Sequence, residues 1–102
     1  MRVALVPDLM DRSRLGAIAD LVVVTTASAL DALTGLGPGD VVAVDLSRDG
    51  ALGAAARAAQ AGAKVLGFAS HVDGETMRAA NAAGVTAMAR SAFFGRAVEL
   101  FE

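Results

Sequence analysis

The chain has 102 residues, a net charge of −2 and no cysteine, which leaves room for a single domain (1–102) and excludes disulfide bonds and zinc–thiolate sites. Its nine basic residues are scattered and it has no Trp or Tyr, so we expect no nucleic-acid partner. No apolar run approaches the roughly 20 residues of a membrane span, and the first run is too short for a signal peptide, so we expect a cytoplasmic protein without membrane contact.

Five short apolar runs recur along the chain and predict five β-strands. They occupy residues 3–6, 21–24, 41–44, 65–68 and 85–88. Each run is too short for a helix and is continuous rather than alternating, which is typical of parallel strands buried on both faces. Alanine-rich segments between the runs predict helices. This alternation with right-handed crossovers predicts an α/β fold, a doubly wound three-layer sandwich around a five-stranded parallel sheet of order 2-1-3-4-5.

Several residues predict where the helices begin and end. Residues 28–31 have the pattern of a capping box at the start of the second helix. Asp73 and Ser91 are expected to cap the fourth and fifth helices through their side chains. Gly62 and Gly84 are expected to close the third and fourth helices, because glycine adopts the left-handed closing conformation at low cost.

The side chains that follow the strands are the candidates for a functional site, because doubly wound sheets bind ligands beyond the carboxyl ends of their strands. We call these residues the strand-end cluster: Asp8, Arg12, Asp45, Ser70, His71 and Arg90. Asp8 and Asp45 follow neighbouring strands about 4.8 Å apart, and two carboxylates so close need a compensating cation. A magnesium ion bound by Asp8 and Asp45 is one possibility. An internal ion pair with Arg12, Arg48 or Arg90 is the interpretation we favour.

Other members of the strand-end cluster have alternative interpretations. His71 is a candidate ligand, proton shuttle or pH-sensitive contact, although a loop histidine more often forms a hydrogen bond with the backbone, which we favour. Arg12 and Arg90 together are a candidate clamp for an anion, weighed against their role in ion pairs. Ser91 is expected to act as a helix cap rather than as a functional hydroxyl.

Three segments give the chain a resemblance to a known family. Residues 3–8 read Val-Ala-Leu-Val-Pro-Asp, residues 40–45 read Asp-Val-Val-Ala-Val-Asp, and residues 84–93 run from Gly-Val to Ala-Arg-Ser-Ala-Phe. Over nearly the whole chain they resemble the receiver domains of two-component response regulators. The resemblance implies a flavodoxin-like fold and a signalling role through protein partners. It also makes Asp45 the candidate phosphoacceptor and Asp8 with Asp45 the candidate Mg²⁺ ligands.

The receiver motif is incomplete in this chain. Pro7 stands where a first acidic residue is expected, and Ala69 stands at the position of the switch hydroxyl. Ser91 takes the place of the lysine, with Arg90 one residue earlier, and the loop after Asp45 is shorter and lacks its proline. Phosphoryl transfer depends on positioning and charge neutralisation. We therefore predict a stand-alone, degenerate receiver-like module for regulation and protein interaction that is neither an enzyme nor phosphorylated.

Two alternatives remain from the same residues. One is a functional phosphoacceptor response regulator that uses Asp45 with Mg²⁺. The other is a small-ligand-binding protein or a minor enzyme on a flavodoxin-like fold. A flavin is disfavoured, because residues 7–11 are acidic and lack the glycine that a phosphate-binding loop needs. The motifs Pro-Asp-Leu-Met, Ser-His-Val-Asp and Ala-Arg-Ser-x-Phe also resemble a group of small receiver-like proteins, which implies the fold without implying a reaction.

The C-terminal segment carries two apolar stripes at helical spacing. The first is made of Phe93, Ala97, Leu100 and Phe101, and the second of Phe94, Val98 and Phe101. One stripe is enough to pack a helix against a sheet, so the second predicts an interface with a partner. A second copy of the chain is the partner we favour, which predicts a homodimer.

Overall fold

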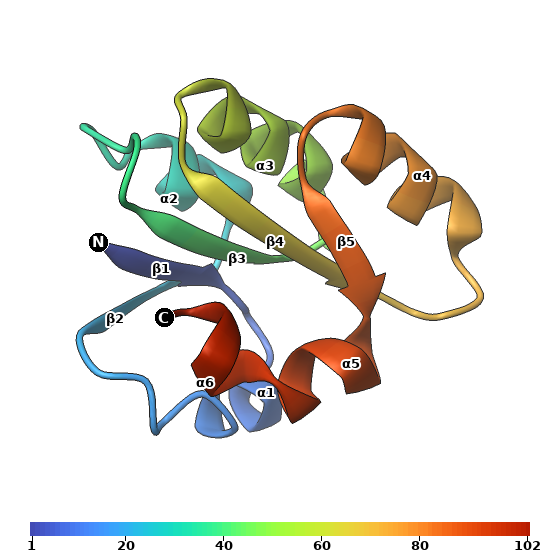
Figure 1. The fold of residues 1–102 in the computed structure, drawn as a ribbon, viewed down its shortest axis with the longest axis horizontal. Helices are drawn as coiled ribbons and strands as arrows, with labels where there is room; N and C mark the ends of the chain where they lie inside the picture. The colour runs from blue at the N-terminus through green and yellow to red at the C-terminus, as the bar shows by residue number, and fades with distance from the viewer.

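The computed structural model describes residues 1–102 and contains a five-stranded, all-parallel sheet. Its strands are β1 (Arg2–Leu5), β2 (Leu21–Val24), β3 (Val41–Asp45), β4 (Lys64–Ala69) and β5 (Thr86–Ala89). Its helices are α1 (Leu9–Ser13), α2 (Ala27–Asp31), α3 (Ala51–Gln60), α4 (Gly74–Ala82), α5 (Arg90–Gly95) and α6 (Ala97–Leu100). The strand order β2-β1-β3-β4-β5 confirms the predicted topology (Figure 1).

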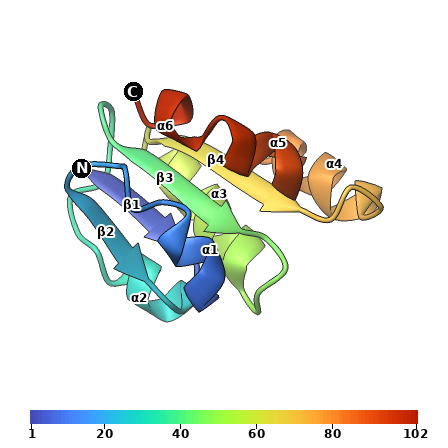
Figure 2. The same cartoon turned by 90° about the horizontal axis from the view of Figure 1, so that it is seen from below.

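Helices cover both faces of the sheet and form the three layers of a flavodoxin-like sandwich. One face carries α2, α3 and α4, and the other carries α1, α5 and α6 (Figures 1 and 2). Successive side chains of β1 point to opposite faces of the sheet. Val3 and Leu5 pack into the first core, whereas Ala4 and Val6, the residue directly after the strand, pack into the second. None of the helices combines the length and apolarity that crossing a membrane would require.

The two cores are filled by side chains of different size. Helix α3 contributes a stripe of small residues to the first core, namely Ala51, Ala54, Ala55 and Ala58. The second core holds the three large rings of Phe68, Phe93 and Phe101, each almost fully buried. Small residues let a helix approach a sheet closely, whereas rings fill a wider space. The first core therefore depends on close approach, and the second depends on aromatic volume.

Gly67 in the middle of β4 shows how closely the chain is packed beside the end of β3. A Cβ atom at this position would lie 2.6 Å from Cδ1 of Leu46, the residue that directly follows β3. Real Cβ atoms do not approach other atoms so closely, so a larger residue at position 67 would require the side chain of Leu46 to shift. The turn after Asp45 is therefore seated on the surface of β4.

Several predicted helix ends are confirmed. Asp73 caps α4, since its Oδ1 accepts a hydrogen bond from the backbone N–H of Thr76 at 3.2 Å. Gly62 and Gly84 follow α3 and α4 with φ angles of 100° and 86°, which is the left-handed region that glycine favours.

Two predicted caps are wrong. Helix α2 is capped by Thr26, whose Oγ1 accepts from the backbone N–H of Ala29 at 3.1 Å, and Ser28 lies inside the helix. Helix α5 begins directly after β5, so its N-cap residue is Ala89 and no side chain caps it. Ser91 therefore lies within the first turn, because the strand leaves no connecting residues in which a cap would stand.

The C-terminal segment forms two short helices rather than one, with Arg96 between them. The first predicted stripe is buried in the second core, as expected: Phe93, Ala97, Leu100 and Phe101. The second stripe does not form a surface. Phe101 is only 2% exposed, and Phe94 is half-buried with its ring 5.1 Å from that of Phe68. Of the predicted interface only Val98 is exposed, and it lies in α6, beyond the break at Arg96.

Candidate functional site

Asp45 is the last residue of β3 and lies at the centre of the carboxyl edge of the sheet, with only 1% of its surface exposed. Its Oδ1 accepts hydrogen bonds from the backbone N–H of Ser47 at 3.0 Å and from Oγ of Ser47 at 2.6 Å. Its Oδ2 accepts from Nε of Arg48 at 3.3 Å. Both carboxylate oxygens of Asp45 therefore accept hydrogen bonds from two nearby residues, Ser47 and Arg48.

A second buried carboxylate, Asp11, lies on α1 and is 4% exposed. The guanidinium of Arg90 donates to its Oδ1 at 2.6 Å and so joins α1 to the start of α5. The same guanidinium lies over the rings of Phe68 and Phe94, 5.3 and 5.4 Å from their centroids, where the negative ring faces attract it. The hydrogen bond with Asp11, helped by the charges of Asp45 and Asp8, raises the pKa of Arg90.

The local structure of α1 explains why Asp11 points inward. Asp8 caps this helix, because its Oδ1 accepts from the backbone N–H of Asp11 at 2.9 Å. Asp11 thus stands in the first turn, four and seven residues before the buried side chains of Leu15 and Ile18. The backbone N–H of Asp11 also lowers the pKa of the exposed Asp8 carboxyl, with smaller help from the charges of Arg48 and Arg90. Asp8 is therefore a helix cap at the rim of the site, not a partner in its interior.

The arginines neutralise the strand-end carboxylates in a different pairing from the predicted one. Arg90 binds Asp11, which was not among the predicted residues, and Arg48 binds Asp45. Arg12 forms no ion pair, and its Nε is the one buried side-chain nitrogen or oxygen that lacks a hydrogen-bond partner. An arginine does compensate Asp45, as expected, but the prediction that Arg12 takes part is wrong.

Ser70 and His71 lie outside this network. Both are exposed in the loop between β4 and α4, and Oγ of Ser70 accepts a hydrogen bond from the backbone N–H of Val72 at 3.4 Å. His71 forms no hydrogen bond or ion pair, so the backbone contact favoured for it is not made. The predicted cluster thus divides into an inner part at Asp45 and Arg90 and a loop that remains in solvent.

The carboxylates do not fit a magnesium ion. No group of three or more His, Cys, Asp or Glu side chains gathers anywhere in the structure in a way that would hold a metal. The oxygens of Asp45 are already occupied by protein donors, and one oxygen of Asp8 accepts from the start of α1. Mg²⁺ requires well-placed oxygens in octahedral geometry, and this pair leaves few of them free.

The sequence analysis did not identify Asp11 and Ser47 as residues of the site, although their spacing from neighbouring residues indicates their roles. Asp11, Leu15 and Ile18 are spaced as one helical face, which indicates that the carboxylate at its start is buried. Ser47 stands two residues after Asp45, the spacing at which Asp side chains accept hydrogen bonds from the following turn.

Exposed apolar side chains surround the same end of the sheet. Leu9 and Met10, in the first turn after β1, are each 71% exposed, and Val72, after β4, is 79% exposed. All three are more exposed than Val98, the remaining residue of the predicted interface. The carboxyl end therefore combines an internally neutralised centre with apolar side chains in solvent.

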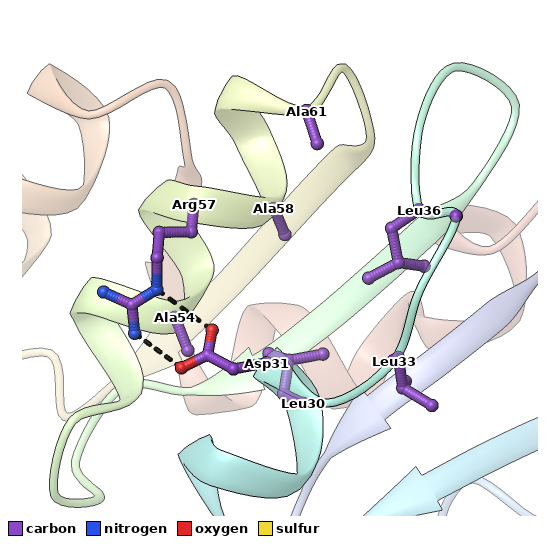
Figure 3. Close-up of a pocket in the computed structure, with 9 residues that line it drawn as sticks. Leu30, Asp31, Leu33, Leu36, Ala54, Arg57, Ala58 and Ala61 are labelled. Atoms are coloured by element: carbon purple, nitrogen blue, oxygen red, sulfur yellow. Dashed lines mark hydrogen bonds and ion pairs between the residues drawn. The ribbon is translucent and has the colours of Figure 1, made fainter.

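The one pocket in the structure lies elsewhere, between α2, the loop that follows it, and α3 (Figure 3). None of the strand-end residues lines it. The pocket therefore does not lie beyond the carboxyl ends of the strands, where the sequence predicted a ligand site.

Comparison of the chain with protein families, curated proteins and solved structures gives no match. The flavodoxin-like sandwich is a fold that hosts many unrelated functions. The fold alone therefore does not indicate a function for this chain, and only its side chains can do so.

Proposed function

We propose that this chain is a receiver-like regulatory module that binds a protein partner and is not phosphorylated. The observation that carries the proposal is the state of Asp45, which is buried and has both carboxylate oxygens bound by Ser47 and Arg48. The receiver resemblance makes this residue the phosphoacceptor. A carboxylate accepts a phosphoryl group only through an oxygen that the donor reaches in line, and the burial and hydrogen bonds of Asp45 oppose that approach, which supports the proposal.

The fixed position of Arg90 supports the same proposal. A residue that responds to phosphorylation has to be free to move toward the new charge, whereas Arg90 is held by Asp11 and by the rings of Phe68 and Phe94. The strand-end cluster is thus a neutralised, internally bonded unit. It acts as a support for the surrounding surface rather than as a centre of chemistry.

The exposed side chains of Leu9, Met10 and Val72 favour the carboxyl end as the contact surface. Because these side chains are exposed, they contribute little to the core of the fold, and they leave apolar surface that a partner can bury. A protein partner, either a different protein or a second copy of this chain, fits these apolar side chains.

Phosphorylation is tested by the intact mass of the purified protein after incubation with acetyl phosphate and Mg²⁺. The wild type is expected to keep its mass, as are Asp45→Asn and a control variant at an exposed carboxylate, Asp49→Asn. A gain of one phosphoryl group by the wild type and by Asp49→Asn, but not by Asp45→Asn, would contradict the proposal and favour a working response regulator.

The contact surface is tested by a photo-crosslinking amino acid placed at Met10 in cells that express the chain. A discrete crosslinked product is expected from this position. The same amino acid at Ala82, exposed on α4, is the matched control. Equal labelling from both positions would show that the carboxyl end is not a specific contact surface.

A further inference from the structure

We propose that the groove between α2 and α3 is a binding site for a neutral, predominantly apolar small molecule. This site is separate from the strand-end cluster and does not depend on the function proposed for it. The groove has a volume of about 430 Å³ and is lined by nine residues, six of them hydrophobic. Both features lie within the range of small-molecule sites, which are concave, mostly apolar and about 300–1,000 Å³ in volume.

The groove exists because the helix that should cover α3 is too short. Helix α2 ends at Asp31 after five residues, and the chain then continues as a loop that contributes Leu33 and Leu36 to one wall (Figure 3). The opposite wall is formed by Ala54 and Ala58 of α3 and by Ala61, the residue that caps the end of this helix. The methyl groups leave the space between the walls unfilled, and the groove opens to solvent beside the exposed side chains of Asp31 and Arg57.

The electrostatics of the groove select a neutral ligand. Its polar wall is formed by Asp31 and Arg57, joined by two hydrogen bonds, Nε to Oδ1 at 3.0 Å and Nη2 to Oδ2 at 2.7 Å (Figure 3). The hydrogen bonds with Arg57 lower the pKa of Asp31, and those with Asp31 raise the pKa of Arg57. Both groups therefore stay ionised and cancel each other's charge. A charged ligand would lose its hydration here without gaining an uncompensated partner.

The size of the groove favours a small molecule over a protein. A standard protein interface takes about 20 to 30 residues from each partner, whereas nine residues line this groove. The groove has two walls, formed by Leu36 and by Ala58, and is open to solvent between them, so an occupant lies between the walls rather than on a flat face. A second copy of the chain is the alternative occupant of the groove, and the experiment tests for it.

The test uses N-phenyl-1-naphthylamine, a neutral apolar dye whose fluorescence rises in apolar surroundings, titrated into the wild-type protein. We expect saturable binding of one dye per chain with a dissociation constant of about 1–100 μM. The variant Ala61→Leu fills the groove from an exposed position and should weaken binding by about tenfold or more. Ala79→Leu, exposed on α4 and outside the groove, is the matched control and should bind as the wild type does.

Two further measurements test whether the dye binds in the groove and whether the groove prefers a neutral ligand. In a ¹⁵N spectrum of the wild type, the dye should shift the amide signals of Gly35 and Leu36 and leave those of Asp8 and Asp45 in place. The anionic dye 8-anilino-1-naphthalenesulfonate should bind about tenfold more weakly, because the groove offers no free positive charge. Equal dye binding by Ala61→Leu, shifts confined to the carboxyl end, or a dimer that Ala61→Leu dissociates would each overturn the proposal.

Discussion

The guanidinium of Arg90 and the carboxylate of Asp11 form a hydrogen-bonded ion pair between residues 79 positions apart in the sequence. The pair spans from the first turn of α1 to the first residue of α5, and two phenylalanine rings flank its cationic side. Asp11 is almost completely buried, whereas 41% of the Arg90 side chain is exposed. Without the pair, the carboxylate of Asp11 would be buried with its charge uncompensated, whereas the guanidinium of Arg90 would still contact water.

Breaking this pair should destabilise the fold. Asp11→Ala leaves a partly buried guanidinium without its partner, and we expect the free energy of unfolding to fall by about 1–3 kcal/mol. Arg90→Lys keeps the charge but loses the planar contact with the rings, and should cost about 1 kcal/mol. Urea unfolding followed by far-UV circular dichroism measures both. Arg96→Lys, at an exposed arginine paired only with Glu99, is the control and should unfold as the wild type does.

Gly67→Ala should be destabilising because the added methyl group meets the side chain of Leu46 at 2.6 Å. Overpacking of this kind costs about 1–3 kcal/mol. The clash is specific, so Leu46→Ala should relieve it in the double variant, whose loss of stability should be smaller than the sum of the two single losses. Additive losses in a urea-unfolding cycle would show that the strand, not the leucine, requires the glycine.

Helix α2 should depend on Thr26 and not on Ser28. Thr26→Ala removes the hydroxyl that accepts from the N–H of Ala29, and a lost N-cap costs about 1 kcal/mol. Ser28→Ala replaces an exposed residue inside the helix and should leave the unfolding midpoint almost unchanged. Larger destabilisation by Ser28→Ala would restore the capping box that the sequence indicated.

Asp8 should contribute to the acid sensitivity of the protein. Its hydrogen bond from the N–H of Asp11 holds its folded-state pKa below the ordinary value of 3.8. The carboxylate therefore stabilises the fold above that pH, and this contribution is lost as the pH falls through the lower, folded-state pKa. Asp8→Asn retains a cap but does not ionise, so its stability should fall less than that of the wild type between about pH 6 and about pH 3.

Urea unfolding at each pH gives the comparison for Asp8→Asn. Asp49→Asn, at another exposed carboxylate, is the matched control and should follow the wild-type dependence on pH. Parallel curves for the wild type and Asp8→Asn would show that the cap does not distinguish the charged from the neutral form.

The sheet was predictable from sequence because its strands are continuous apolar runs, and the three central ones, β1, β3 and β4, are buried along most of their length. Runs such as Val41–Val44 need no partner to be recognised, since continuous apolar residues of that length indicate a central parallel strand. Once five such runs alternate with helices, handedness and connection rules leave few possible strand orders. The strand order and the two helix-covered faces follow from local pattern combined with these general rules.

The pairings at the carboxyl end were not predictable in the same way. Arg90 had three acidic residues within reach, Asp8, Asp11 and Asp45, and the choice depends on which one the first turn of α1 directs inward. That direction follows from the cap at Asp8, a local detail that strand spacing does not contain. The groove was not predicted for a related reason, because it depends on α2 ending at Asp31 although two good helix formers, Ala32 and Leu33, follow it.

The aromatic cluster gives the protein an unusual spectroscopic property. The chain has four phenylalanines and no Trp or Tyr, and three of the rings, Phe68, Phe93 and Phe94, lie within 5.1 Å of one another, centroid to centroid. Near-ultraviolet dichroism comes from aromatic rings held in fixed surroundings. That signal therefore reports mainly on one end of the molecule, beside Arg90, and an event at this end can be followed optically without any label.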